Sequence, residues 1–239
     1  MLIDTHLHEK KFSEDSFISL EEIVDKGRKL GLDGVCITDH DSNAIRSEAQ
    51  SLSQKTGFLI ITGAEVLTLE GDMTVFGLER LPEKKVHARE LIQMTEAAGG
   101  VAICSHPYRQ NNRGMGDLIR HLPLIWGIEA FNGSTPKHHN QQAFDLSLEL
   151  NVAALGASDA HVIEQVGKFA TWMPDWVKDE TGFIHAVKKG LTLPAAYEYG
   201  SYKIFREGFY TKADLSNTRV PAQLSSEDHG YIARSDTLR

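Results

Sequence analysis

LIDTHLH, at residues 2–8, combines the short alternation of a first β-strand with an unusual polar face. Alternate residues of a strand point to the same side, so Asp4, His6 and His8 share one face while Thr5 and Leu7 point to the other. A carboxylate and two imidazoles in a row suit a cation better than an apolar core. The interpretation therefore depends on whether the rest of the chain supplies further ligands.

Length and composition indicate one globular domain of substantial size. The chain has 239 residues, of which 41% are hydrophobic and 24% are charged. This length allows a sizeable core and is common for an α/β barrel. The formal net charge of −8 argues against broad binding of long nucleic acids, although short oligonucleotides stay among the candidate partners.

Membrane and secretory signals are missing from the sequence pattern. No apolar run approaches the roughly 20 residues of a membrane span, and no basic segment followed by an apolar stretch opens the chain. Cys36 and Cys104 lie inside apolar runs and are expected to be core thiols in a reducing compartment. We therefore expect a cytoplasmic protein with no membrane partner.

Short apolar runs alternate with helical patterns along the first 200 residues. The expected strands are 2–6, 34–38, 58–64, 73–78, 101–105, 127–131, 153–157 and 193–198. The expected helices are 19–30, 42–55, 86–98, 115–122, 136–150 and 180–189. Such units predict parallel strands with right-handed crossovers, in an α/β fold that is a closed or nearly closed barrel. A doubly wound sheet is the alternative, and 73–78 is expected to form a hairpin with the preceding strand.

The chain changes character after residue 200. Residues 201–239 are polar, with mixed charges and little periodicity. We expect a barrel domain over 1–200, followed by a tail that packs on the barrel or on a neighbouring subunit. Such a tail is a candidate exchange arm for an oligomer.

Side chains of the types that bind metals lie at the end of nearly every expected strand. They are Asp4, His6, His8, Asp15, Asp39, His40, Glu65, His106, Glu129, Asp159 and His161. The carboxyl ends of barrel strands converge on one mouth, so these side chains are expected to meet there. Mixed imidazole and carboxylate ligands suit Zn, Mn or Fe ions. A pair of such ions is able to clamp a phosphate group and to activate a water molecule.

Five motifs in order carry a resemblance to a known family. They are DTHLH (4–8), TDHD (38–41), GAE (63–65), SHP (105–107) and SDAH (158–161). Together they resemble the motifs of the PHP (polymerase and histidinol phosphatase) superfamily, over about residues 1–200. The resemblance implies a distorted (β/α)7-type barrel, with a metal site at the C-terminal ends of the strands. It also implies a small stand-alone phosphoesterase that uses two or three divalent ions.

The resemblance also implies a set of ligands for each ion. These are His6, His8, Glu65 and Asp159 for one ion, Glu65 and His106 for a second, and Asp15, His40 and His161 for a third. Many family members supply one more histidine to the second ion, from a segment that reads GDMTVFGL here. Asp72 stands at that position. Either Asp72 replaces the histidine as an oxygen ligand, or this site is weaker or lacks its ion.

Two arginines follow the strand that ends at His106. Arg109 and Arg113 are expected to bind substrate, because guanidinium groups match the geometry of phosphate oxygens. Arg109 would also stabilise the charge that develops during catalysis. Asn132 is a candidate substrate contact, or alternatively part of the turn before Gly133.

Three carboxylates have expected roles beside the ions. Asp159 is the candidate for moving a proton during catalysis. Asp4 and Asp39 are expected to orient the ligand imidazoles rather than to bind an ion themselves. Glu129 stays open between a structural and a functional role.

The expected activity is hydrolysis of a phosphate ester by a metal-activated water. A nucleotide, a small phosphorylated metabolite and a short oligonucleotide are the candidate substrates. An amidohydrolase-type metal hydrolase and a non-catalytic metal-binding PHP module are the alternatives. The product separates the two enzyme classes, since only a phosphoesterase releases phosphate.

Overall fold

The computed structural model describes residues 1–206, and most of its elements lie where the apolar periodicity predicts them. The strands are β1 (Leu2–Leu7), β2 (Gly34–Ile37), β3 (Leu59–Thr62), β4 (Ala64–Leu67), β5 (Asp72–Phe76), β6 (Val101–Cys104), β7 (Gly127–Asn132), β8 (Ala153–Ala157), β9 (Phe169–Trp172), β10 (Leu193–Glu198) and β11 (Ser201–Ile204). The helices are α1 (Leu20–Leu30), α2 (Arg46–Thr56), α3 (Ala88–Ala97), the 3-10 helix η1 (Gly116–His121), α4 (Lys137–Glu149) and α5 (Glu180–Lys188).

Helix α1 illustrates how local signals set the boundaries of an element. Ser19 accepts a hydrogen bond from the backbone N–H of Glu22, and the Glu22 side chain accepts one from Ser19 in return. This reciprocal pair satisfies two N–H groups that the first turn leaves free. Gly31 ends the helix at φ +81°, a left-handed conformation that glycine adopts without strain.

The strands form two mixed sheets. One has the order β11-β10-β9-β1-β2-β3 and the other β4-β5-β6-β7-β8. The β1-β2-β3 and β6-β7-β8 neighbours are parallel, as the strand–helix repeats predict. The expected hairpin is confirmed, because β4 and β5 pair in antiparallel register. The fold is therefore α/β with mixed sheets.

The expected single strand 58–64 is wrong, because Gly63 divides it into β3 and β4. A Cβ atom at Gly63 would lie 2.6 Å from the carbonyl oxygen of Val75, so this residue allows the backbone of β5 to approach closely. The chain passes from one sheet to the other at this point. Two strands, β9 and β11, are additions that the sequence pattern did not predict.

The two sheets approach each other at the carboxyl ends of their parallel strands. Isolated β-bridges join Leu7 to Ala160 and His40 to Glu65, each in parallel orientation. The hydrogen bonds divide the strands of residues 1–206 between two separate sheets, so a single closed (β/α)7 barrel stays a prediction. The bridges nevertheless bring strand ends from both sheets together.

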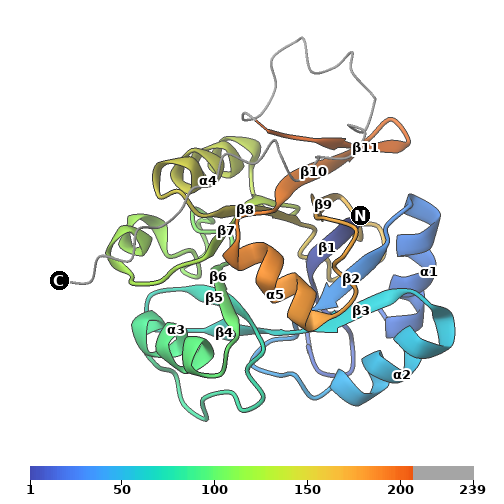
Figure 1. Cartoon of the computed structure of the whole chain (residues 1–239), viewed down its shortest axis with the longest axis horizontal. Helices are drawn as coiled ribbons and strands as arrows, with labels where there is room; N and C mark the ends of the chain where they lie inside the picture. The colour runs from blue at the N-terminus through green and yellow to red at the C-terminus, as the bar shows by residue number, and fades with distance from the viewer. Residues whose placement is uncertain (207–239) are drawn as a thin grey trace. The chain divides into compact units, whose positions relative to one another are not determined.

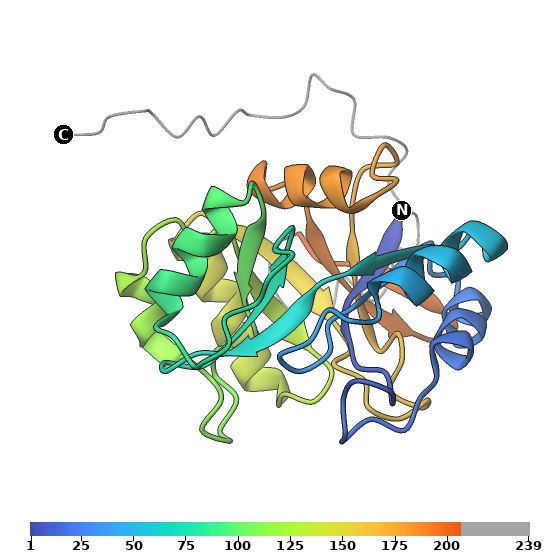
Figure 2. The ribbon, with the colours of Figure 1, turned by 90° about the horizontal axis from the view of Figure 1, so that it is seen from below.

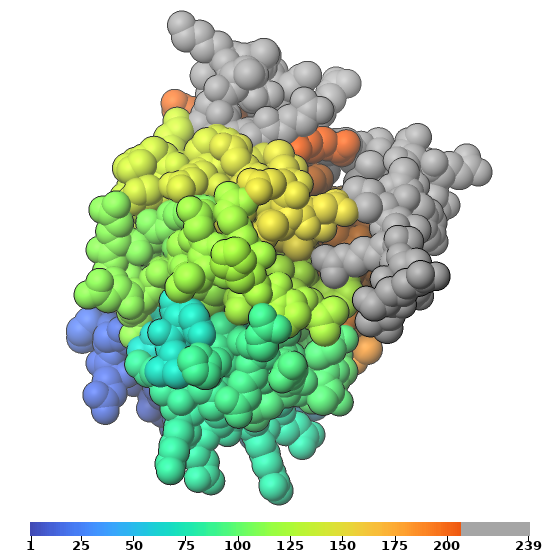
Figure 3. All heavy atoms as spheres, turned by 90° about the vertical axis from the view of Figure 1, so that its left-hand side faces the viewer, coloured from blue at the N-terminus to red at the C-terminus, as the bar shows by residue number. Residues whose placement is uncertain are grey.

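One apolar core lies between the sheets and is closed by α5 at the opposite, amino ends of the strands. It combines Ile3 of β1, Ile61 of β3, Phe76 of β5 and Ile103 of β6 with Phe183 of α5. Helices α1 and α2 pack beside β2 and β3, and α3 and α4 beside β6 and β7 (Figures 1 and 2). Figure 3 shows the face that α3, η1 and α4 form. The carboxyl ends are left for the polar cluster.

The described part of the chain bears on several of the expectations from composition. Cys36 and Cys104 are free and fully buried, as predicted for core thiols. Within residues 1–206, no helix is long and apolar enough to cross a bilayer. The expected boundary at residue 200 passes through a hairpin, since β11 pairs with β10. The remainder of the expected tail, 207–239, lies outside the described residues.

Candidate metal centre

His6 and His8 leave the end of β1 and present adjacent ring nitrogens to one another. His6 Nε2 lies 3.0 Å from His8 Nε2, and the Oδ1 atom of Asp159 is 3.7 Å and 3.3 Å from these nitrogens. All three side chains are buried. The two imidazoles that the opening motif predicts to lie on one face therefore converge on a common point with a carboxylate.

Glu129, on β7, fixes the orientation of His6. Its Oε1 atom lies 2.9 Å from His6 Nδ1, and its Oε2 atom accepts the backbone N–H of His106 at 2.8 Å and the Asn132 amide at 3.0 Å. A carboxylate only accepts hydrogen bonds, so Nδ1 carries a proton and Nε2 is directed at the cluster. Burial lowers the pKa of His6, but Glu129, Glu65 and Asp159 together raise it well above its usual value. The site thus has a surplus of negative charge that attracts a cation.

Ser13 and Asp39 fix the orientation of His8. His8 Nδ1 lies 3.2 Å from Ser13 Oγ, and Ser13 Oγ donates to Asp39 Oδ1 at 3.0 Å. Burial lowers the pKa of His8 to about 4, which leaves the ring neutral and its Nε2 lone pair available. Asp39 therefore acts on an imidazole through Ser13, which the sequence analysis did not single out.

Glu65, at the start of β4, lies at the centre of the cluster and uses both oxygens. Oε1 is 2.9 Å from His106 Nε2 and 3.5 Å from His6 Nε2. Oε2 is 2.9 Å from His40 Nδ1 and 3.7 Å from His8 Nε2. Burial raises the pKa of Glu65, but the surrounding histidines lower it well below its usual value. An ionised carboxylate with imidazoles at each oxygen has the arrangement that a bridging ligand needs.

Asp72 and His106 complete a group with Glu65. Asp72 Oδ2 lies 3.7 Å from His106 Nε2 and accepts a hydrogen bond from Arg113 Nε at 2.6 Å. Burial and the nearby Glu65 raise the pKa of Asp72 to about 6. His106 has φ +27°, an uncommon conformation for a residue with a side chain.

Asp15, His40 and His161 form the exposed rim of the cluster. Asp15 Oδ2 lies 3.1 Å from His40 Nε2 and 3.3 Å from His161 Nε2. The Asp15 side chain is 57% exposed, and those of His40 and His161 are 26% and 24% exposed. This side of the centre is therefore open to an incoming molecule, whereas the remaining members are buried.

Asp159 is held by residues from three different segments. Its Oδ2 atom accepts hydrogen bonds from Arg109 and from the Asn132 amide, while Oδ1 faces His6 and His8. Its φ of +52° places it in the left-handed region, where a side chain adds strain. Asp4 supports this loop, because it accepts the backbone N–H groups of Ser158 and Gly167. Asp4 thus orients the backbone beside Asp159.

Asn132 is fully buried and engaged on both sides of its amide. Its Nδ2 atom donates to Glu129 and Asp159, and its Oδ1 atom accepts hydrogen bonds from Arg109 and from Thr135. A direct substrate contact by Asn132 stays a prediction, and in this structure the residue positions Asp159 and Arg109.

The structure brings all nine expected ligands into one cluster. Three groups in it have one ligand atom per residue, all within 4.8 Å of one another: His6, His8 and Asp159; Glu65, Asp72 and His106; and His8, His40 and His161. Glu129 and Ser13 are the functional neighbours that the sequence analysis left open or missed. Glu129 lies within β7 and belongs to none of the five motifs, and Ser13 gives no sequence signal of its own.

The donor chemistry of this cluster fits divalent cations. Its ligand atoms are imidazole nitrogens and carboxylate oxygens, the mixed set that Zn, Mn and Fe accept. Asp72 Oδ1 is buried and has no hydrogen-bond partner among the described residues, an uncommon state for a carboxylate. A cation at this point would satisfy that oxygen and the surplus negative charge.

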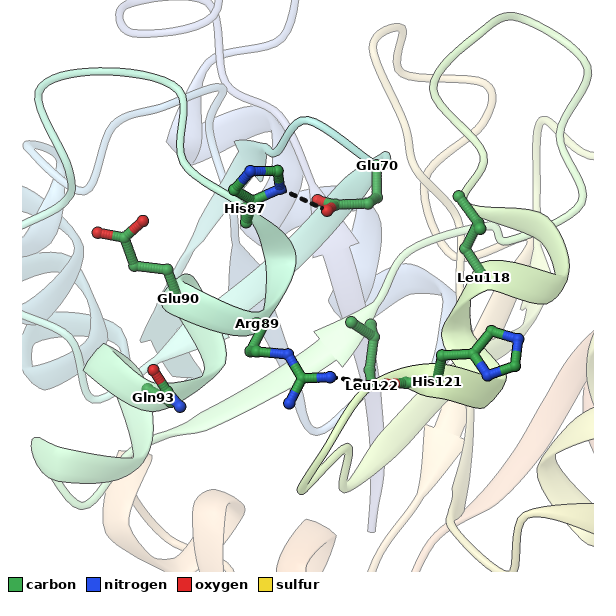
Figure 4. A pocket seen from close by; sticks show the side chains of 8 residues that line it. All are labelled: Glu70, His87, Arg89, Glu90, Gln93, Leu118, His121 and Leu122. Carbon is green, nitrogen blue, oxygen red and sulfur yellow. Dashed lines mark hydrogen bonds and ion pairs between the residues drawn. The ribbon is translucent and has the colours of Figure 1, made fainter.

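A separate open pocket of about 720 Å³ lies between α3 and η1 (Figure 4). Its lining consists of Glu70, His87, Arg89, Glu90, Gln93, Leu118, His121 and Leu122. Glu70 contacts His87 and caps the start of α3, and Arg89 donates to the backbone of His121. None of these eight residues belongs to the histidine–carboxylate cluster, which has the chemistry of a catalytic site and is the better candidate.

Two family models match this chain. A family model described as "PHP domain" matches residues 4–162, and one described as "PHP-associated" matches 137–192. An uncharacterized protein of Methanocaldococcus jannaschii, MJ1587, is 33% identical over 141 residues, which cover 55% of this chain and 82% of that protein.

Solved structures with the same fold include two bacterial proteins. A protein of Bifidobacterium adolescentis, assigned as a metal-dependent phosphoesterase, has a TM-score of 0.56 and 19% identity over 67% of this chain and 87% of its own. An amidohydrolase of Chromobacterium violaceum with bound sulfate has a TM-score of 0.61 and 16% identity over 77% of this chain and 96% of its own. At these identities the likeness concerns the fold alone.

Proposed function

Because this chain belongs to the PHP domain family, we propose that it is a metal-dependent phosphoesterase. The observation that carries the proposal is the convergence of nine imidazole and carboxylate side chains with two arginines in one cluster. The family and the fold neighbours support the broader class of metal-dependent hydrolases. That the bond cleaved is a phosphate ester goes beyond these comparisons and is part of our proposal.

Three groups, of which the first two share Glu65, would hold the ions. We assign His6, His8, Glu65 and Asp159 to one ion, Glu65, Asp72 and His106 to a second, and Asp15, His40 and His161 to a third, with Zn, Mn or Fe as the candidates. When bound, such ions polarise a phosphoryl group and lower the pKa of a coordinated water. The His8 ring also lies within reach of the third group, so it is a further candidate ligand there.

The protein's own groups bind and orient the substrate. The side chains of Arg109 and Arg113 are 16% and 34% exposed, and each contacts a carboxylate of the cluster, Asp159 and Asp72 respectively. Guanidinium groups in this position would bind phosphoryl oxygens and stabilise the charge that builds on them in the transition state. Asn132 and Glu129 hold Arg109, Asp159 and His6 in place for this purpose.

Asp159 is the group that we propose to receive a proton from the attacking water. Its Oδ1 atom faces the cluster, and His161 Nδ1 lies 3.7 Å from it on the exposed rim. Burial raises the pKa of Asp159, but His6, His8 and Arg109 lower it well below its usual value. Such a weak base would hold the proton only briefly before releasing it to solvent at the exposed rim.

We propose a small phosphorylated substrate, namely a nucleotide, a phosphorylated metabolite or a short oligonucleotide. The net charge of −8 disfavours a long polyanion, whereas the two arginines provide a local positive edge. An amidohydrolase is the second candidate, favoured by the fold shared with the Chromobacterium violaceum protein. A binding module without catalysis is the third, and it predicts bound metal with no turnover.

Product analysis distinguishes these candidates. Protein loaded with Mn²⁺ or Zn²⁺ is incubated with an aryl phosphate ester, and in parallel with an aryl amide. Phosphate release that disappears in Glu65→Gln supports the proposal. Hydrolysis of the amide alone supports the amidohydrolase, and absence of both activities in metal-loaded protein supports the binding module.

A further inference from the structure

Arg109 and Arg113 come from one loop, residues 107–116, yet they contact carboxylates of the cluster differently. Arg109 binds the Oδ2 atom of Asp159, while the Oδ1 atom of Asp159 faces His8 Nε2 at 3.3 Å and His6 Nε2 at 3.7 Å. The two oxygens thus serve different partners. A cation beside His6 and His8 is therefore able to share Asp159 with Arg109.

Arg113 instead contacts the oxygen of Asp72 that faces the cluster. Arg113 Nε lies 2.6 Å from Asp72 Oδ2, and it is this same Oδ2 atom that lies 3.7 Å from His106 Nε2. Arg113 Nη2 is also 3.9 Å from Glu65 Oε2. A guanidinium therefore lies beside both carboxylates of the Glu65–Asp72–His106 group, where it opposes the entry of another cation.

The backbone keeps Arg113 near Asp72. The N–H of Asp72 donates to the Arg113 carbonyl at 2.8 Å. Gly71 permits this approach, since a Cβ atom there would lie 2.8 Å from the same carbonyl oxygen. The ion pair is thus tied to the start of β5 rather than made by a free surface side chain, and the Asp72 carboxylate is fully buried.

We propose that Arg113 competes with a divalent cation for Asp72, which makes the Glu65–Asp72–His106 group the weakest of the ion sites. The inference rests on the proposed metal-dependent function. A cation that binds Asp72 through Oδ2, the oxygen nearer His106, requires Arg113 to leave that oxygen, and the departing guanidinium is then free to bind a phosphoryl oxygen. Arg109 has no such conflict, because its oxygen of Asp159 faces away from the two histidines.

A matched pair of variants tests the competition without any measurement of activity. Metal-free wild type, Arg113→Gln and Arg109→Gln are titrated with Mn²⁺, and free Mn²⁺ is followed by electron paramagnetic resonance. Both substitutions remove one positive charge from the same loop. We expect Arg113→Gln to lower the dissociation constant of the weakest ion about tenfold, and Arg109→Gln to leave it unchanged or raise it. Equal tightening in both variants would indicate general electrostatics and would overturn the proposal, as would wild-type binding by Arg113→Gln.

A double substitution tests whether Arg113 and the cation compete at Asp72 itself. In an Asp72→Asn background, Arg113→Gln is expected to have no further effect on Mn²⁺ binding, and a persisting tenfold effect would refute the competition. Thermal melting followed by circular dichroism establishes that each variant is folded. A folded wild type that binds no Mn²⁺ would refute the metal centre itself, whereas wild-type binding that is insensitive to Arg113→Gln refutes only the competition.

Discussion

The substitution Glu129→Gln tests whether this carboxylate determines which ring nitrogen of His6 carries the proton. The backbone N–H of His106 and the Asn132 amide both donate to Oε2, so the amide oxygen of the new glutamine must take that position. Its NH₂ group then faces His6 Nδ1, which lies 2.9 Å from Oε1 in the structure. A donor there forces the proton of His6 onto Nε2, the nitrogen that faces the cluster.

Loss of such a partner typically lowers metal affinity about 10- to 100-fold, which corresponds to roughly 1.4–2.7 kcal/mol. We expect this weakening in a Mn²⁺ titration of Glu129→Gln, together with a comparable loss of phosphate release at limiting metal. Glu70→Gln is the matched control, because Glu70 also contacts a histidine, His87, and a backbone N–H outside the cluster. A folded Glu129→Gln with wild-type affinity for Mn²⁺ would show that Glu129 does not set the proton position of His6.

Three further outcomes follow from particular contacts. Glu65→Gln should lower the rate of phosphate release by about 100-fold or more, because one of its two cluster-facing oxygens is replaced by a donor NH₂ group. Residual activity above a tenth of wild type in metal-loaded protein would argue against a bridging role. Burial raises the pKa of Asp39 from 3.8 to about 7, so its contribution to stability is complete below pH 4 and is lost as the pH rises through 7. The free energy of unfolding of metal-free protein, measured by melting at a series of pH values, should therefore fall by about 2–4 kcal/mol from pH 4 to above pH 7. Asp39→Asn should flatten this dependence on pH, and the same pH dependence in wild type and variant would contradict the prediction. Gly133→Ala should destabilise the fold by about 1–3 kcal/mol in urea unfolding, because its Cβ would lie 2.2 Å from the Ser158 carbonyl oxygen; an unchanged midpoint would show that this backbone yields.

Much of the fold was predictable because its signals are local. Ser19 and Gly31 bound α1 through contacts within a few residues, and the ends of β1 and β6 coincide with the short motifs that contain His8 and His106. The division of 58–64 at Gly63 was not predictable, because it depends on the approach of β5 from a later part of the chain. Strand β9 was not predictable either, because it pairs with β1 at only two positions and its partner lies at the other end of the described chain.

The same distinction separates the ligands from their supporting groups. Imidazoles and carboxylates in ordered motifs predict which side chains meet, and the cluster contains all nine of the side chains expected to bind ions. The partners of these ligands come from distant segments and have no fixed spacing to them. Glu129 reaches His6 across the two sheets, and Arg113 reaches Asp72 because a glycine permits close packing of two loops. Such contacts are properties of the folded chain rather than of any short stretch.

The most direct test of the account is metal content measured on the same sample as phosphate release. Protein purified without a metal-binding tag is analysed for Zn, Mn and Fe, then assayed with an aryl phosphate ester before and after chelation. The account predicts two or three ions per chain, phosphate release, and loss of both on chelation with recovery on addition of Mn²⁺ or Zn²⁺. Phosphate release that persists in fully metal-free protein, or a folded protein that retains no divalent ion under any condition, would contradict it.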